Sequence, residues 1–92
     1  MGLLRFLGKK RAVNYSLIKN GKSVDIGVTS DPYHRNLQHR ASGKKYDYMK
    51  ITSGILPRRT ALRNETRNLK SYKKATGRRP RYNKTSDGKF KY

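Results

Sequence analysis

The sequence contains no cysteine and no tryptophan, and only five of its 92 residues are acidic. Without cysteine the chain can form neither a disulfide framework nor a thiolate zinc site. The apolar cluster in residues 3 to 7 is too short for a membrane span or a signal-peptide core, and a basic run follows it at residues 9 to 11. We therefore expect no membrane partner and a cytoplasmic protein, with residues 1 to 11 as an N-terminal extension.

Positive charge dominates what is present. Lys and Arg together number 24, the formal net charge is +19 and the isoelectric point is about 10.8. Phosphate groups are the natural counter-ions of such a chain, and binding them would relieve its self-repulsion. The composition therefore indicates a nucleic-acid partner, DNA or RNA, and a place with intracellular DNA as in a nucleoid. It leaves the oligomeric state open.

Two alternating segments predict a β-hairpin. Apolar residues alternate in residues 12 to 19 and again in residues 23 to 29, which is the period of a strand. Asn20 and Gly21 lie between the two segments and supply the positive φ angles of a tight turn. We therefore expect the two strands to pair antiparallel.

Two helices and a third strand should follow the hairpin. Pro32 opens the first helix, which should run to about Ser42 and end at Gly43. Residues 46 to 52 predict the third strand, and residues 58 to 75 predict a second, longer helix.

These elements predict an α+β fold in the order strand, strand, helix, strand, helix. The sheet should be small, mostly antiparallel and three-stranded, with helices flanking it. A length of 92 residues suits a single domain, with a core at residues 12 to 77 and a basic C-terminal segment at residues 78 to 92. That segment is either an ordered arm or a tail that nucleic acid orders.

Glu65 is the only glutamate in the sequence. It shares a three-and-four spacing with Leu62, Leu69 and Tyr72, which places it on the apolar face of the second helix. A carboxylate near a phosphate ligand is repelled unless a cation lies between them. This inward acid therefore suggests a metal ion and phosphodiester chemistry.

Cations that we expect to contact nucleic acid follow the other side of this helix and continue into the C-terminal segment. Numerous Lys and Arg contacts supply affinity for the phosphate backbone without discriminating between bases. The predicted nucleic-acid-binding residues are Arg63, Arg67, Lys70, Lys74, Arg78, Arg79, Arg81 and Lys84.

Arg35 and His39 lie four residues apart in the first helix and therefore share a face, while Tyr33 and Leu37 share the other. A guanidinium offers a planar fork of donors that suits phosphate, and a histidine beside it can move a proton near neutral pH. The same spacing is also common on an ordinary solvated helix face.

The order of these residues resembles the GIY-YIG nuclease superfamily, and the resemblance covers residues 13 to 85. Its parts are Val13-Asn14-Tyr15, Asp25-Ile26-Gly27-Val28-Thr29, Arg35, His39, Glu65 and Pro80-Arg81-Tyr82-Asn83-Lys84-Thr85. In that family a β-hairpin carries the two name motifs, and helices carry the Arg, His and Glu.

The resemblance implies a metal-dependent endonuclease that cleaves DNA with a single Mg²⁺ or Mn²⁺ ion. Glu65 would hold the metal, and Tyr15 would act near the attacking water as base or proton relay. A tyrosine needs a nearby cation, the metal or Arg35, to ionise near neutral pH. Arg35 would also clamp the phosphate, His39 would hydrogen-bond or relay a proton, and Asn83 would position the phosphate or its neighbour.

The sequence departs from the family motifs in two places. Val13 and Asn14 replace the glycine and isoleucine of the first motif, which is a mild change, but Asp25 replaces the tyrosine of the second. Asp25 could act as base, supply a second metal ligand, mark a member without activity, or pair with a neighbouring charge. A strict two-residue turn would pair Tyr15 with Ile26 and turn Asp25 to the opposite face, so a bulge or longer loop is needed to bring Asp25 and Tyr15 together.

A function of another class competes with the nuclease. The charge alone would suit a non-catalytic nucleic-acid-binding module on the same scaffold, whereas the ordered motifs and the inward Glu65 favour the enzyme. Tyr46, Tyr48 and Tyr72 could stack on bases, although in a chain without tryptophan they are expected mainly as core residues.

Overall fold

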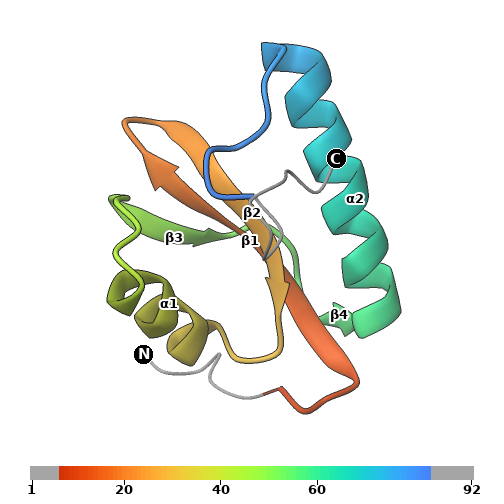
Figure 1. The fold of residues 1–92 in the computed structure, drawn as a ribbon. Helices are drawn as coiled ribbons and strands as arrows, with labels where there is room; N and C mark the ends of the chain where they lie inside the picture. The colour runs from red at the N-terminus through yellow and green to blue at the C-terminus, as the bar shows by residue number, and fades with distance from the viewer. Residues whose placement is uncertain (1–6, 84–92) are drawn as a thin grey trace.

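The computed structural model describes residues 7–83, so six residues of the predicted N-terminal extension and Lys84 lie outside the described part. The elements follow one another as β1 (Arg11–Lys19), β2 (Lys22–Thr29), α1 (Pro32–Ala41), β3 (Tyr48–Ile51), β4 (Leu56–Pro57) and α2 (Arg58–Thr76) (Figure 1). The α+β class and the order of the five main elements are confirmed.

The sheet is antiparallel, and within residues 7–83 it has four strands rather than the predicted three. Its order is β2-β1-β3, and β4 pairs with the start of β1 through Arg11 and Ala12. β4 has only two residues and includes Pro57, which cannot donate a ladder hydrogen bond. Such a strand carries no alternation, so the sequence gives no signal for it.

The turn of the hairpin forms as expected, because Asn20 and Gly21 both have positive φ angles of 52° and 76°. The pairing of the two strands then shifts by one residue between Leu17 and Ile18, which leaves Val24 as a bulge. Beyond the bulge Leu17 pairs with Asp25 and Tyr15 pairs with Gly27. Asp25 therefore lies on the same face as Tyr15.

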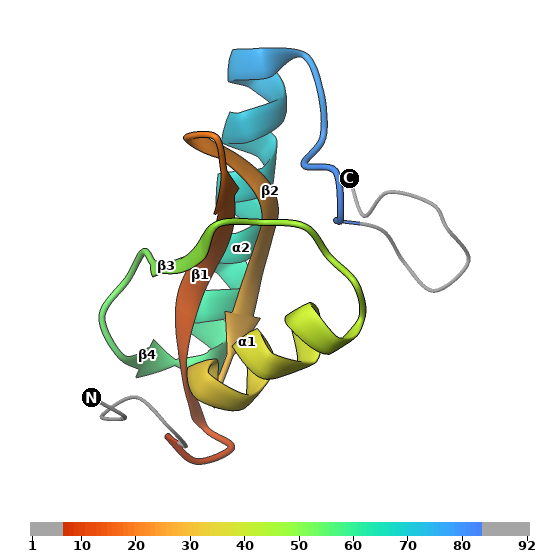
Figure 2. The ribbon, with the colours of Figure 1, turned by 90° about the vertical axis from the view of Figure 1, so that its left-hand side faces the viewer.

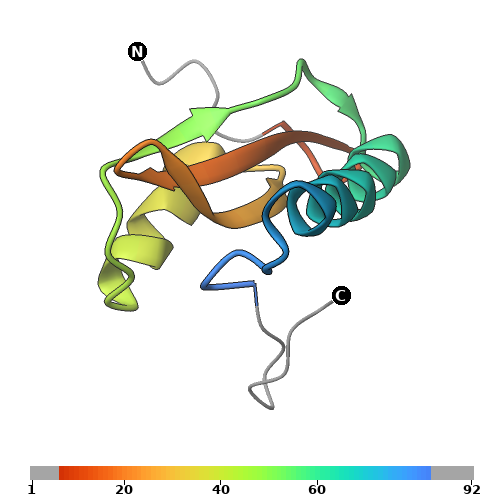
Figure 3. The same ribbon diagram turned by 90° about the horizontal axis from the view of Figure 1, so that it is seen from above.

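Both faces of β1 are covered, since its residues 12 to 18 are all buried. Figure 2 shows α2 behind the hairpin and α1 in front of it, and Figure 3 shows the hairpin between the two helices from above. One apolar cluster consists of Ala12, Val28 and Ala61, and the other of Tyr15, Leu17 and Tyr46. Within residues 7–83, neither helix is long and apolar enough to cross a bilayer.

The described part of the basic C-terminal segment is an ordered arm that returns along β2. α2 ends at Gly77, whose φ of 73° is the left-handed conformation that glycine favours. The chain then turns back, and the backbone N–H of Tyr82 donates to the carbonyl of Val24 over 2.7 Å. Residues 78 to 83 (blue in Figure 1) thus cover the outer edge of β2.

Candidate active site

A cavity of about 310 Å³ beside β2 brings together all six residues that the sequence predicts to be catalytic. They come from β1, β2, both helices and the C-terminal arm. They are Tyr15, Asp25, Arg35, His39, Glu65 and Asn83.

Gly27 allows Tyr15 to reach this cavity. A Cβ atom at Gly27 would lie 2.5 Å from the Tyr15 Oη atom and 2.6 Å from its Cζ atom, so no other residue fits without moving the ring. The Tyr15 ring therefore lies across the backbone of β2. This contact gives Gly27 a physical role in the site.

A chain of short contacts runs from Tyr15 to Asp25. The Tyr15 Oη atom lies 2.8 Å from His39 Nε2, and His39 Nδ1 lies 2.9 Å from Lys44 Nζ. Lys44 Nζ in turn donates to Asp25 Oδ2 over 2.7 Å. Lys44 is thus the central contact of the site, although the sequence does not distinguish it among 24 basic residues.

The lysine determines which nitrogen of His39 carries the proton. A lysine ammonium has three donors and no acceptor, so His39 Nδ1 must accept from it. The neutral imidazole then carries its proton on Nε2, the atom that faces Tyr15. His39 therefore donates a hydrogen bond to the Tyr15 oxygen and leaves the phenol proton free to point elsewhere.

The surroundings keep His39 neutral. Burial of the ring, followed by the positive charges of Lys44 and Arg35, lowers its pKa from 6.5 to about 4. At neutral pH the side chain is a fixed hydrogen-bond donor rather than a cation. This environment favours the hydrogen-bonding role among the two roles expected for His39.

The electrostatics of Tyr15 differ from the expectation. Burial raises the pKa of the phenol above its ordinary 10.0, and the nearby carboxylates of Asp25 and Glu65 raise it further. Arg35 opposes the rise through its charge and its N–H donors, but it does not outweigh the burial. Arg35 alone is therefore insufficient to ionise Tyr15 near neutral pH.

Asp25 has a local charge partner, one of the roles considered for it. Its side chain is 7% exposed, and the ion pair with Lys44 occupies its Oδ2 atom. The bulge at Val24 is what turns this carboxylate toward Tyr15. The cavity thus holds an aspartate–lysine ion pair.

Glu65 lies on the inner face of α2 and lines the cavity, with 8% of the residue exposed. Within residues 7–83 no group of three or more His, Cys, Asp or Glu side chains could form a metal cage. Mg²⁺ commonly uses one or two carboxylates and completes its shell with water and substrate phosphate. A single buried carboxylate in an open cavity fits that mode of binding.

Asn83 contacts the protein backbone. Its Oδ1 atom accepts from the N–H of Ile26, and its Nδ2 atom donates to the carbonyl of Ile26, each over 2.7 Å. The amide thus pairs with β2 as a neighbouring strand would. This contact anchors the C-terminal arm beside the cavity.

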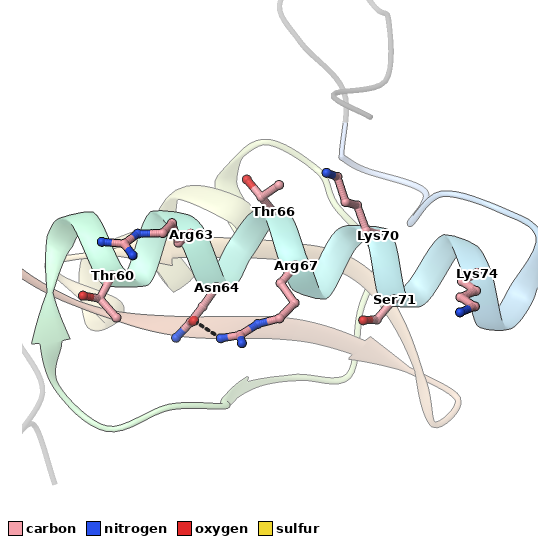
Figure 4. A pocket seen from close by; sticks show the side chains of 8 residues that line it. All are labelled: Thr60, Arg63, Asn64, Thr66, Arg67, Lys70, Ser71 and Lys74. Atoms are coloured by element: carbon pink, nitrogen blue, oxygen red, sulfur yellow. Dashed lines mark hydrogen bonds between the residues drawn. The ribbon is translucent and has the colours of Figure 1, made fainter.

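Most of the predicted nucleic-acid-binding residues lie away from the cavity. Arg63, Arg67, Lys70 and Lys74 follow the exposed outer side of α2 (Figure 4). The arm carries three more exposed cations, at positions 78, 79 and 81. Lys84 lies outside the described residues.

The structure also adds residues to the predicted site. Arg58, Leu62 and Tyr82 line the cavity with Lys44. The sequence assigns Tyr82 no catalytic role. Its hydroxyl accepts a hydrogen bond from the backbone N–H of Lys45 over 3.0 Å, which connects the loop after α1 to the C-terminal arm. Of these four residues, the helical spacing of the sequence predicts only Leu62 on the inward face of the second helix.

Comparison with known proteins identifies no relative. No family model matches the chain, no curated protein matches it, and no solved structure matches it. The chemistry of the cavity and the order of its residues are therefore the basis for assigning a function.

Proposed function

We propose that this protein is a metal-dependent endonuclease of the GIY-YIG type, which hydrolyses DNA phosphodiester bonds with one divalent cation. One observation carries the proposal: six residues chosen for their order in the sequence, from Tyr15 to Asn83, line the same cavity. A scaffold that only binds nucleic acid has no need to gather a phenol, a guanidinium, an imidazole and a buried carboxylate.

Glu65 is the residue that would hold Mg²⁺ or Mn²⁺. The cation supplies, when bound, positive charge that stabilises the leaving oxygen and favours the ionised form of the neighbouring phenol. In this proposal Glu65 carries the metal-binding role because its carboxylate lies on the inner face of α2 and lines the cavity.

The remaining side chains act on the attacking water and the phosphate. His39 Nε2–H donates to Tyr15 Oη and so stabilises a phenolate at that atom. The phenolate, formed when the phenol releases its proton to solvent, accepts a proton from the water whose oxygen bonds to phosphorus. The bond to the leaving sugar oxygen breaks, and that oxygen takes up a proton from solvent. Arg35 faces the same cavity and neutralises the charge that builds on the phosphate oxygens.

A plasmid-nicking assay tests the proposal. The purified chain should nick supercoiled plasmid with Mg²⁺ or Mn²⁺ and should not do so with EDTA. Arg35→Ala should lower the rate on the order of a hundredfold or more while DNA binding changes by less than about 1 kcal/mol, since many other cations hold the DNA. Arg59→Ala, which removes an exposed arginine outside the cavity, is the matched control. Equal losses of binding and rate in Arg35→Ala would make Arg35 an ordinary backbone contact.

The second candidate is a non-catalytic nucleic-acid-binding module. The observations that favour it are the aspartate in place of the second tyrosine and the raised pKa of Tyr15. It predicts tight, salt-sensitive DNA binding with no nicking under any metal condition. The same plasmid assay therefore separates the two functions.

A further inference from the structure

Four cations form a narrow line on α2. Arg63, Arg67, Lys70 and Lys74 follow a spacing of four, three and four residues, which keeps them within about 60° around the helix axis and spreads them over about 16 Å. All four are exposed (Figure 4). We call these four residues the outer α2 surface.

The outer α2 surface points away from the candidate active site. The α2 residues that line the catalytic cavity are Arg58, Leu62 and Glu65. At 100° per residue, their mean direction lies about 140° around the helix from the line of cations. The full width of the helix, about 10 Å, separates the two. A phosphate in the catalytic cavity is therefore out of reach of these side chains.

A series of hydrogen bonds connects the outer α2 surface to the buried residue Asn14. The Arg67 guanidinium donates to Asn64 Oδ1 (dashed line in Figure 4), and Asn64 Nδ2 donates to Asn14 Oδ1 over 3.3 Å. Asn14 is 1% exposed and also donates from Nδ2 to the Ala61 carbonyl over 2.9 Å. Asn14, one of the two departures from the first family motif, thus orients Arg67 through Asn64.

The chemistry of this surface suits a phosphate backbone. No acidic residue lies on α2 except Glu65, which is on its inner face. Like charges three and four residues apart repel one another and weaken a helix, so a polyanion on this line would relieve the repulsion. Thr60, Asn64 and Ser71 line the same groove and offer neutral hydrogen-bonding groups between the cations.

We propose that the outer α2 surface is a second nucleic-acid-binding site, which holds the phosphate backbone of a second nucleic-acid segment while the candidate active site holds the first. The proposal rests on the proposed function only for the identity of the first segment. It makes the protein able to bring two segments, or two parts of one folded strand, to opposite sides of α2.

Counting duplexes tests the proposal. We expect the wild-type chain to bind two short DNA duplexes per chain in EDTA, measured by native mass spectrometry. The quadruple variant of the outer surface, with Gln at positions 63, 67, 70 and 74, should bind one. A control with Gln at four exposed lysines elsewhere, positions 9, 10, 22 and 50, loses the same charge and should still bind two. Equal counts in the two variants would overturn the proposal.

Bridging gives an independent readout. Protein bound to a bead-tethered duplex should capture a second, labelled duplex. The quadruple variant of the outer α2 surface should capture at least about tenfold less labelled duplex than the control variant. Each of the four cations should contribute about 0.9 to the slope of log affinity for the second duplex against log salt concentration. The magnitude of that slope should therefore be roughly 3.6. If the outer α2 surface bound polyglutamate more tightly than the duplex, the proposal that nucleic acid occupies this surface would be contradicted.

The two proposals can fail separately. If the quadruple variant melts below the control, the double variant Arg63→Gln/Lys74→Gln keeps the central part of the helix and should show part of the same loss. Bridging without nicking in Mg²⁺ would contradict the nuclease alone. Nicking with no difference between the two quadruple variants in duplex count or capture would contradict the second site alone.

Discussion

Lys44 contacts both Asp25 and His39 in the candidate site, so its removal has a calculable effect. Its Nζ atom lies 2.7 Å from Asp25 Oδ2 and 2.9 Å from His39 Nδ1, and the Lys44 and Asp25 side chains are 23% and 7% exposed. Removing one partner of a buried ion pair typically destabilises a protein by about 3–5 kcal/mol. Because Lys44 is partly exposed, we expect Lys44→Met to lower the free energy of unfolding by about 2–3 kcal/mol.

Two measurements check this prediction. Urea unfolding should show that Asp25→Asn, which removes the buried charge, restores most of the stability lost in Lys44→Met, with a coupling energy of about 1–3 kcal/mol. Nitrogen-15 NMR should show the His39 proton on Nε2 in the wild type and a mixture of tautomers in the variant. The His39 pKa should rise above its value of about 4 but stay below 6.5, because burial of the ring and Arg35 still lower it while Lys44 no longer does.

Lys45→Met is the matched control, since Lys45 is the exposed neighbour and the substitution keeps the backbone N–H that donates to the Tyr82 hydroxyl over 3.0 Å. A Lys44→Met protein as stable as Lys45→Met, with an unchanged His39 tautomer, would refute the role assigned to the lysine.

Two further predictions follow from the same site. Gly27→Ala should destabilise the fold by about 1–3 kcal/mol in urea unfolding and should abolish nicking, because the new Cβ displaces the Tyr15 ring; Gly54→Ala, which meets no atom within 4 Å, should do neither. Because the pKa of His39 is about 4 in the fold and 6.5 in the unfolded chain, the unfolded state binds a proton first on acidification. The contribution of His39 to stability, about 3 kcal/mol, should therefore be lost as the pH falls from 6.5 to 4, and His39→Gln should flatten that part of the stability curve.

Local chemistry explains which parts of the fold could be predicted. Asn20 and Gly21 specify the turn, and Asp31 caps α1 by accepting from the His34 N–H over 3.1 Å. Helical spacing alone placed Glu65 on the inner face of α2, where it is buried. In each case the signal lies within a few residues of the feature.

Other features depend on contacts between distant segments, and the sequence did not determine them. The bulge at Val24 decides whether Asp25 and Tyr15 share a face, and the sequence left both registers open. In the sequence Lys44 cannot be distinguished from the other Lys and Arg residues, which total 24 with it. In the fold, the loop after α1 places it between His39 and Asp25. Long-range packing, rather than local preference, selects these arrangements.

Glu65→Gln tests the central claim most directly, because it keeps the shape of the side chain and removes the charge that would hold the cation. The account predicts that plasmid nicking falls on the order of a hundredfold or more, the protein remains folded, and metal-free DNA affinity stays equal or rises. Asp47→Asn makes the same change of charge at an exposed site and should retain nicking. A Glu65→Gln protein that melts lower yet nicks plasmid in proportion to its folded fraction would contradict the account, since Glu65 would then be a structural acid.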